Sequence, residues 1–170
     1  MEDKKKKEHL SIYGVGPYYG FIVVVLTVLA VIFRNHSSIS KGKIEFIRIP
    51  CIAIGVVLIV VAIYMWIQAV LIDKIDDGIM QNQLVTHGIY GFVRNPIYSC
   101  IMIFCTGIVI ITGNVFLFFL PIVFWLCMTV LVSQTEEKWL RALYGEAFEE
   151  YCRTVNRCIP FPPRRYKEKK

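Results

Sequence analysis

The sequence lacks the residue clusters that hold a metal ion or build a disulfide framework. Its six cysteines form no Cys-x-x-Cys pair, and four of them lie inside apolar stretches, namely Cys51, Cys100, Cys105 and Cys127. Isolated cysteines in such stretches are typical of small buried hydrophobic residues. The three histidines are far apart in the sequence, so no metal site is predicted. Charged residues are also scarce, at 19% of the chain, and they leave long apolar runs between them.

These runs indicate an integral membrane protein. Hydrophobic residues make up 56% of the chain, and they concentrate in segments of membrane-spanning length. We expect an all-α fold, a membrane bundle of four transmembrane helices. The uncharged turn at residues 112–114 should join the last two as a tight helical hairpin, with a kink at Pro121. The four predicted helices cover about residues 15–33, 49–72, 97–111 and 115–132.

After the fourth run the sequence becomes charged and amphipathic. Residues 133–151 predict an interfacial helix that Gly145 interrupts. We expect one membrane domain over residues 1–170, with no second, soluble domain. Within it, residues 1–80 hold an N-terminal tail and two helices, residues 81–161 a core, and residues 162–170 a basic tail.

The positive charge predicts an orientation in the membrane. A net charge of +6 on a soluble protein would suggest nucleic acid, but here the charge lies in tails and loops. With four spans, 15 of the 19 Lys and Arg residues fall on one side, together with both termini. Positively charged segments stay cytoplasmic, so we expect cytoplasmic termini, in the cell membrane if the source is prokaryotic. The expected surroundings are membrane lipids, without nucleic acid.

One polar stretch, residues 84–98, lies between two apolar blocks and contains the strongest helix-start signal. Asn95 is a favoured N-cap, and Pro96 suits the first helical position. The free N–H groups of such a start favour an anionic group, and Arg94 adds a fixed positive charge. Tyr90 and Tyr98 flank it. Alternatively, the stretch is a capped interfacial helix with a snorkelling arginine and an aromatic belt.

An acidic pair, Glu136 and Glu137, lies just beyond the fourth predicted helix. A hairpin would return this helix end to the level of Arg94 and Asn95. The resulting site would suit a zwitterionic cofactor that has an ammonium, a carboxylate and a ribose. Alternatively, the pair is a solvated helix face on which Glu137 and Arg141 form an i,i+4 ion pair.

Together these residues resemble a known superfamily. The run from Leu84 to Tyr98, the apolar hairpin, the acidic pair, Tyr144-Gly145, Tyr151 and Ile159-Pro160-Phe161 are similar in order and spacing to the isoprenylcysteine carboxyl methyltransferase and phospholipid methyltransferase superfamily. The resemblance covers roughly residues 80–161, about half of the chain. It implies a membrane enzyme that binds S-adenosyl-L-methionine without a Rossmann fold.

The resemblance also implies particular site residues. By position, the cofactor contacts fall on Asn82, Gln83, Leu84, Val85, Tyr90, Asn95, Pro96, Ile97, Tyr98 and Glu136. We expect Glu136 to bind an ammonium or hydroxyls, and Arg94 to orient an anionic acceptor or the cofactor carboxylate, and both are catalytic candidates. His87 is either a base or a solvent-exposed residue.

Three positions depart from the superfamily pattern. Asn95 stands where His is usual, and Cys100 where Gly is common. In the prenylcysteine enzymes an Arg one turn before the acidic pair holds the substrate carboxylate, but residues 132–134 here contain none. We therefore expect a lipophilic or small apolar methyl acceptor in preference to a prenylated peptide.

Two other functions stay open on the sequence. A membrane reductase with a sterol-reductase-like core would bind NADPH at the same place, although such enzymes are much longer. A non-catalytic membrane binding protein could keep the fold, but the presence of Tyr90, Arg94, Tyr98 and Glu136 argues against it.

Overall fold

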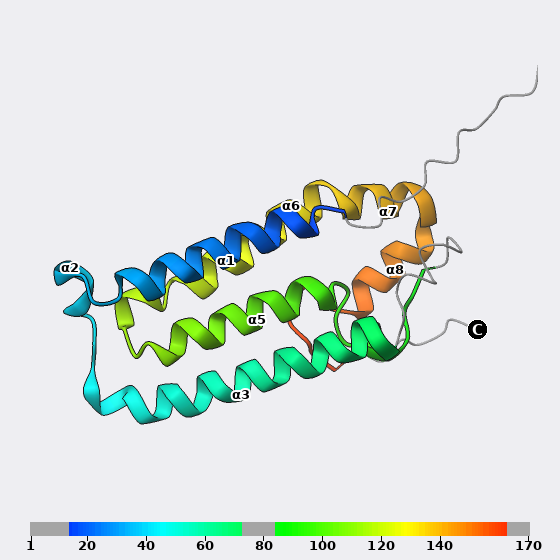
Figure 1. Ribbon diagram of the computed structural model, residues 1–170. Coiled ribbons are helices and arrows are strands. Elements are labelled where there is room, and N and C mark those ends of the chain that lie inside the picture. Colours follow the sequence, from blue (N-terminus) through cyan, green and yellow to red (C-terminus); the bar gives the residue numbers. More distant parts are fainter. Residues whose placement is uncertain (1–13, 73–83, 163–170) are drawn as a thin grey trace, which may run out of the picture.

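The computed structural model describes residues 14–72 and 84–162 as an all-helical structure. Within these ranges there are two isolated β-bridges and no strand. The α-helices are α1 (Gly16–Phe33), α2 (Ser37–Ser40), α3 (Arg48–Ile67), α5 (Pro96–Ile111), α6 (Leu120–Gln134), α7 (Glu136–Tyr144) and α8 (Glu146–Thr154). Short 3-10 helices are η1 (Glu45–Ile47), η3 (Gly88–Gly91) and η4 (Val115–Leu117), and a π-helix, η2 (Gln68–Ile72), continues α3. The four long helices lie side by side, with α5 between α1 and α3 (Figure 1).

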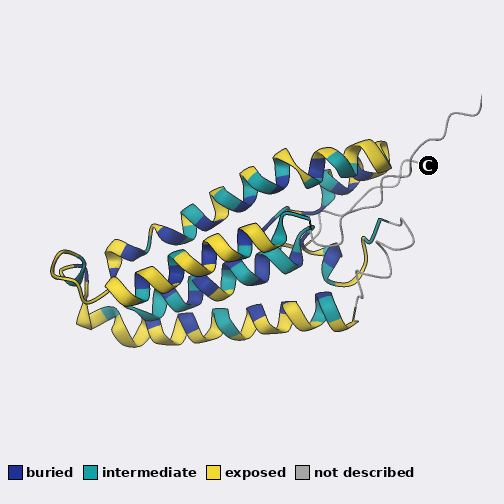
Figure 2. Ribbon diagram, turned by 45° about the horizontal axis from the view of Figure 1, so that its top comes forward, coloured by how far each residue is buried: buried dark blue, intermediate teal, exposed yellow. Residues whose placement is uncertain are grey.

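Within residues 14–72 and 84–162, three segments are long and apolar enough to cross a membrane: Gly16–Phe33, Glu45–Ile72 and Val115–Tyr144. The fourth apolar helix, α5, has 16 residues and is shorter. At 1.5 Å per residue it reaches about 24 Å, against roughly 30 Å of hydrocarbon. Figure 2 shows exposed residues along the outer faces of the long helices, and many of them are large and apolar, such as Phe21, Ile54 and Ile122. This is the pattern of helices that face lipid.

The bundle packs around α5. A buried cluster joins α1, α5 and α6, and its largest members are Tyr19, Phe124 and Met128. On the other side α5 approaches α3 closely, because Gly55 and Gly107 face each other across the contact. A Cβ on Gly107 would lie only 2.7 Å from the backbone oxygen of Gly55. Small residues at such crossings let membrane helices pack backbone to backbone.

The connection between α5 and α6 confirms the predicted turn at residues 112–114. Gly113 takes a left-handed conformation, with φ of 61°. The buried Asn114 side chain accepts a hydrogen bond from the Phe116 backbone N–H at 3.0 Å and donates one to the Ile39 oxygen at 2.8 Å. The α5–α6 connection and α2 therefore lie together at one end of the bundle. Residues 84–95, α7 and α8 lie at the other end (Figure 1).

Two predicted details of the C-terminal half are corrected. Pro121 does not kink a helix that starts at residue 115. It lies instead in the first turn of α6, after the short helix η4, where its missing N–H removes no helical hydrogen bond. The expected interfacial helix is two helices, α7 and α8, because Gly145 between them has φ of 54°.

Candidate functional site

The start of α5 is held by the chain segment that follows α8. Asn95 is the N-cap residue, as predicted, but its side chain does not cap the helix. The Asn95 side-chain amide donates instead to the backbone oxygen of Arg157 at 3.1 Å, and its backbone N–H reaches the same oxygen at 3.3 Å. The predicted position of the N-cap is therefore confirmed, but the predicted hydrogen bond from its side chain to α5 is wrong. The Arg157 oxygen, distant in the sequence, binds that side chain instead.

This pairing continues over several residues. The Arg94 backbone N–H donates to the Asn156 oxygen at 2.8 Å, and Val93 and Asn156 form an isolated parallel bridge. The Phe161 N–H donates to the oxygen of Phe92 at 3.3 Å. Residues 92–95 and 156–161 thus run alongside each other and position Arg94 and Arg157 next to one another.

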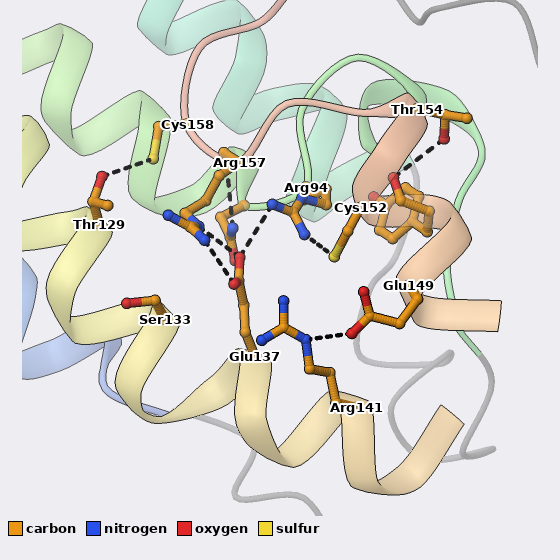
Figure 3. Close-up of polar contacts among 12 residues, drawn as sticks. Arg94, Thr129, Ser133, Glu137, Arg141, Glu149, Cys152, Thr154, Arg157 and Cys158 are labelled. Atoms are coloured by element: carbon orange, nitrogen blue, oxygen red, sulfur yellow. Dashed lines mark hydrogen bonds and ion pairs between the residues drawn. The ribbon is translucent and has the colours of Figure 1, made fainter. Parts of the chain in front are cut away.

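Between these two arginines lies the buried carboxylate of Glu137, only 2% exposed (Figure 3). Arg157 donates to both carboxylate oxygens, from Nε to Oε1 at 2.6 Å and from Nη2 to Oε2 at 2.8 Å. Arg94, with 8% of its side chain exposed, approaches Oε1 through Nη2 at 3.2 Å. The hydrogen bond to Glu137 raises the pKa of Arg157 above its ordinary value. Glu137 therefore holds the two paired segments to α7.

The remaining contacts of this cluster come from α8. The Arg94 Nη1 donates to the Cys152 thiol, and its guanidinium carbon lies 5.9 Å from the ring centroid of Phe148. Arg141 pairs with Glu149 at 2.7 Å (Figure 3). The alternative i,i+4 pair between Glu137 and Arg141 is thus not formed.

Glu136, one residue earlier, has entirely different neighbours. Its Oε1 accepts a hydrogen bond from the Tyr98 hydroxyl and another, at 2.9 Å, from the backbone N–H of Val15 before α1. The Tyr98 ring contacts that of Tyr19 edge to face, with centroids 5.9 Å apart. Glu136 is half-buried, and its described hydrogen bonds all go to Oε1.

The other predicted site residues lie near this end of the bundle. Tyr90 is buried in η3, and its backbone oxygen accepts a hydrogen bond from Tyr151 at 2.6 Å. Leu84 packs against the apolar cluster of α8. The next residue, Val85, is half-buried. The first turn of α5 contains Pro96, Ile97 and Tyr98. Asn82 and Gln83 lie outside the described residues, and His87 is exposed.

The two charges at the start of α7 are compensated differently. Glu137 has two arginines around it, so its negative charge is balanced within the protein. Glu136 has a hydroxyl and a backbone N–H, which are neutral donors. A half-buried carboxylate with only neutral partners is suited to a cationic group or to hydroxyls. No cluster that could hold a metal ion occurs among the described residues.

An apolar groove of about 320 Å³ begins a few residues along α5 from Tyr98. Helices α1, α3 and α5 line it, with Thr27, Ala62, Trp66, Cys100, Ile101 and Phe104 among its walls. The Thr27 hydroxyl is satisfied within α1, where it donates to the Val23 oxygen at 2.8 Å. The groove therefore offers only apolar surface to a ligand.

The chain is similar in sequence to proteins of a known family. Residues 46–147, more than half of the chain, match the family model for phospholipid methyltransferase. The chain belongs to the phospholipid methyltransferase family. The superfamily resemblance found in the sequence is thereby confirmed. The matched stretch contains α3, α5, α6 and α7, whereas α1 and most of α8 lie outside it.

Curated relatives of this methyltransferase family member cover a similar share of the chain. The protein-S-isoprenylcysteine O-methyltransferase of Schizosaccharomyces pombe is 36% identical over 83 residues, which are 47% of this chain and 34% of that protein. A probable protein-S-isoprenylcysteine O-methyltransferase of Oryza sativa subsp. indica is 32% identical over 82 residues, 48% of this chain and 42% of that protein. The chain thus spans well under half the length of these relatives. No solved structure matches it.

Sequence reasoning missed three partners in the site. Arg157 carries the main contact of Glu137, Cys152 contacts Arg94, and Val15 contacts Glu136. The one signal for Arg157 is its position as a charged residue between the apolar residues Val155 and Ile159. The contacts of Cys152 and Val15 could not be predicted, because neither a thiol on an amphipathic helix nor a backbone N–H has a characteristic sequence pattern.

Proposed function

We propose that this phospholipid methyltransferase family member is an integral membrane methyltransferase that uses S-adenosyl-L-methionine. Its methyl acceptor is a lipophilic or small apolar molecule. The observation that carries the proposal is the pairing of Glu136 with Tyr98 at the start of α5. The pair presents a carboxylate without a charged partner among the described residues, in the half of the chain that the family model matches.

The residues present fit such a cofactor. Because both described hydrogen bonds use Glu136 Oε1, its Oε2 is left to accept from the cofactor ammonium or ribose. Asn82, Gln83, Leu84 and Val85 and the ring of Tyr90 are proposed to hold the adenosine. Asn95, Pro96, Ile97 and Tyr98, in the first turn of α5, are proposed to hold the amino acid end, where free N–H groups favour its carboxylate.

Arg94 is the second charged residue of the proposed site. Glu137 and Cys152 engage its two Nη groups, and its buried Nε makes no hydrogen bond within the described residues. This Nε–H is proposed as the donor that orients an anionic group of the acceptor or the cofactor.

When bound, the cofactor would supply a methyl group activated by its sulfonium charge, which would pass to the acceptor and leave S-adenosylhomocysteine. The protein residues then contribute alignment and exclusion of water more than acid–base chemistry. A carboxylate or thiolate acceptor needs no base, and Asn95, in the place where the superfamily usually has His, does not titrate.

The apolar groove supports a lipophilic acceptor. Its lining from α1, α3 and α5 would pack against the apolar part of the molecule, which loses no favourable surroundings when it moves from lipid into the groove. Because Cys100 and Ile101 follow Tyr98 closely, the reactive head would lie near the proposed cofactor. The acceptor thus enters from the bilayer with its head at the Glu136 end.

Four membrane spans with both termini cytoplasmic complete the proposal. The α5–α6 pair forms the hairpin, and α5 crosses despite its 16 residues because its neighbours shield its ends. Reporter fusions at positions 38 and 165 test this orientation. We expect position 38 outside the cytoplasm and 165 inside, and a cytoplasmic position 38 would refute the four-span arrangement.

Calorimetry of the detergent-purified protein tests the cofactor. We expect S-adenosylhomocysteine to bind and NADPH not to bind. NADPH binding without S-adenosylhomocysteine binding would replace the proposal with a reductase, and binding of neither would refute it.

Transfer of a labelled methyl group tests the acceptor. The panel holds N-acetyl-farnesylcysteine, phosphatidylethanolamine, a hydrophobic acid and simple thiols. Because residues 132–134 contain no arginine, we expect the label on the lipid headgroup, acid or thiol in preference to the farnesylcysteine. Efficient, selective methylation of the farnesylcysteine carboxylate would mean that another group, such as Arg94 or Arg153, replaces the missing arginine.

A further inference from the structure

The first turn of α1 lies directly on the two residues that carry the proposed function. Val15, the N-cap residue of α1, donates its backbone N–H to Glu136 Oε1 at 2.9 Å across 121 positions of the chain. The Tyr98 hydroxyl donates to the same oxygen. Residues 14–16 precede the stretch 46–147 that the family model matches, so the family likeness says nothing about this contact.

Two glycines make the close approach possible. Gly14 has φ of 46°, and a Cβ there would collide with Glu136 Oε1 and lie 3.2 Å from the Tyr98 hydroxyl. A Cβ on Gly16 would lie 2.8 Å from Cε1 of the Tyr98 ring. Gly20, the next glycine of α1, differs from both. Its Cβ would meet Ile101 at 3.6 Å, an ordinary van der Waals distance.

The carboxylate also gains from its place at the start of a helix. The first N–H groups of α1 have no partner within the helix, and the positive end of the helix dipole favours a negative charge. Oε1 of Glu136 is therefore fixed by two donors before any ligand arrives. Fixing a side chain with several rotatable bonds in advance lowers the entropy lost on binding, which is the usual benefit of preorganisation.

We propose that residues 14–16 are a positioning element of the cofactor site. Val15 holds Oε1 of Glu136, which leaves Oε2 for the ligand, and Gly14 and Gly16 provide the space in which Glu136 and Tyr98 meet. This inference rests on the proposed function, because the ligand that Glu136 awaits is the cofactor.

The variant Gly16→Ala separates this role from simple packing. Ala is a better helix former than Gly, so α1 itself is not weakened, while Tyr98 must move away from the added methyl group. We expect the affinity for S-adenosylhomocysteine to fall about 10-fold, the size of one lost hydrogen bond. The KM for the cofactor should rise and that for the acceptor stay the same. Gly20→Ala is the matched control, with unchanged affinity and an unfolding temperature no lower than that of the wild-type protein.

A double-variant cycle between Gly14 and Glu136 gives a second readout. Gly14→Ala should weaken S-adenosylhomocysteine binding in the native background. In a Glu136→Ala background most of this loss should disappear, because the colliding carboxylate is gone, and a small loss should remain from the left-handed backbone of residue 14. Additive losses in the two backgrounds would contradict a role through Glu136.

The outcomes separate the two proposals. If the wild-type protein binds S-adenosylhomocysteine and Gly16→Ala binds it equally well, the positioning role is refuted and the proposed function stands. If the wild-type protein does not bind it, both are refuted. A loss of affinity shared by Gly20→Ala would assign the effect to α1 packing and also refute the inference.

Discussion

Glu136 and Glu137 are neighbours in the sequence and begin the same helix, yet they lie in two different regions of the molecule. Glu137 is enclosed by Arg94 and Arg157, in a cluster that joins α7 to residues 92–95 and 156–161. Glu136 faces Tyr98 and Val15, at the junction of α5 and α1. Successive helical residues point about 100° apart, so one turn of α7 serves both regions.

The different neighbours give Glu137 a structural role and leave Glu136 available for binding. A carboxylate between two guanidiniums has its charge balanced, and its removal would leave one buried and one half-buried cation without an anion. A carboxylate with two neutral donors keeps its charge available to a ligand. Sequence position alone gives the two residues equal claims to the site, and only their surroundings distinguish them.

Replacing Glu137 should have the largest effect of all. Glu137→Ala leaves the buried Arg94 and the half-buried Arg157 without their anion, so we expect a loss of about 3 kcal/mol in the free energy of unfolding, the lower end of the range for a broken buried pair. Denaturation in mixed detergent micelles measures it. Glu149→Ala is the control, because its pair with Arg141 is exposed and should contribute less than about 1 kcal/mol. If both variants lost the same unfolding free energy, the burial of the Glu137 ion pairs would make no difference to stability, and the prediction would be wrong.

Replacing Glu136 should instead affect binding. Glu136→Ala removes a charge-assisted hydrogen bond to the proposed cofactor, worth roughly 1.5–3 kcal/mol, so affinity for S-adenosylhomocysteine should fall about 10- to 150-fold. Its unfolding free energy should fall by less than that of Glu137→Ala. The exposed Glu150 of α8 gives the control variant, Glu150→Ala. Unchanged binding in Glu136→Ala would exclude Glu136 from the site.

Arg94 lies in the Glu137 region, one residue before the N-cap of α5, and its conservative replacement sharpens the comparison. A lysine ammonium cannot reach Glu137 and Cys152 together as the planar guanidinium does. We expect Arg94→Lys to lower turnover by about 10-fold or less, and more than Arg153→Lys on the exposed face of α8. Turnover equal to that of Arg153→Lys would show that the guanidinium shape is irrelevant.

The smallest expected effect concerns the Cys152 thiol. Burial raises its pKa, and the charge of Arg94 opposes that shift only in part. Alkylation by iodoacetamide, followed at Cys152 by mass spectrometry, should therefore increase with pH at a higher midpoint than in a free peptide, where it is about 8.5. A midpoint below that of the peptide would mean that Arg94 outweighs burial.

Much of the fold was predictable because its signals are local. Apolar runs located α1, α3 together with η2, and α5 to within one residue, and Pro96 indicated the start of α5. The fourth predicted helix began at residue 115, whereas α6 begins at Leu120. The turn at residues 112–114 followed from its lack of charge and its glycine. The kink at Pro121 was wrong, because a proline fits the first turn of a helix as well as a kink inside one, and only the position of the helix start decides.

The site was predictable only as a group of residues. The spacing of the apolar segments predicted that Tyr98 and the acidic pair lie at the same end of the bundle, and in the structure they do. It could not assign Arg157 to Glu137 or Val15 to Glu136, since these contacts join distant parts of the chain. For the same reason the side chain of Asn95 was placed on its own helix and not on the Arg157 oxygen.

The long hydrogen bond between Val15 and Glu136 has a consequence for biosynthesis. At about 5–20 residues per second, the ribosome needs roughly 6–24 s to add the 121 residues that separate them. By then α1 and α3 have had time to enter the bilayer. The contacts among α1, α3 and α5 can therefore form before the polar end closes. A defect at that end should yield a chain that inserts and accumulates in the membrane yet never acquires a working site.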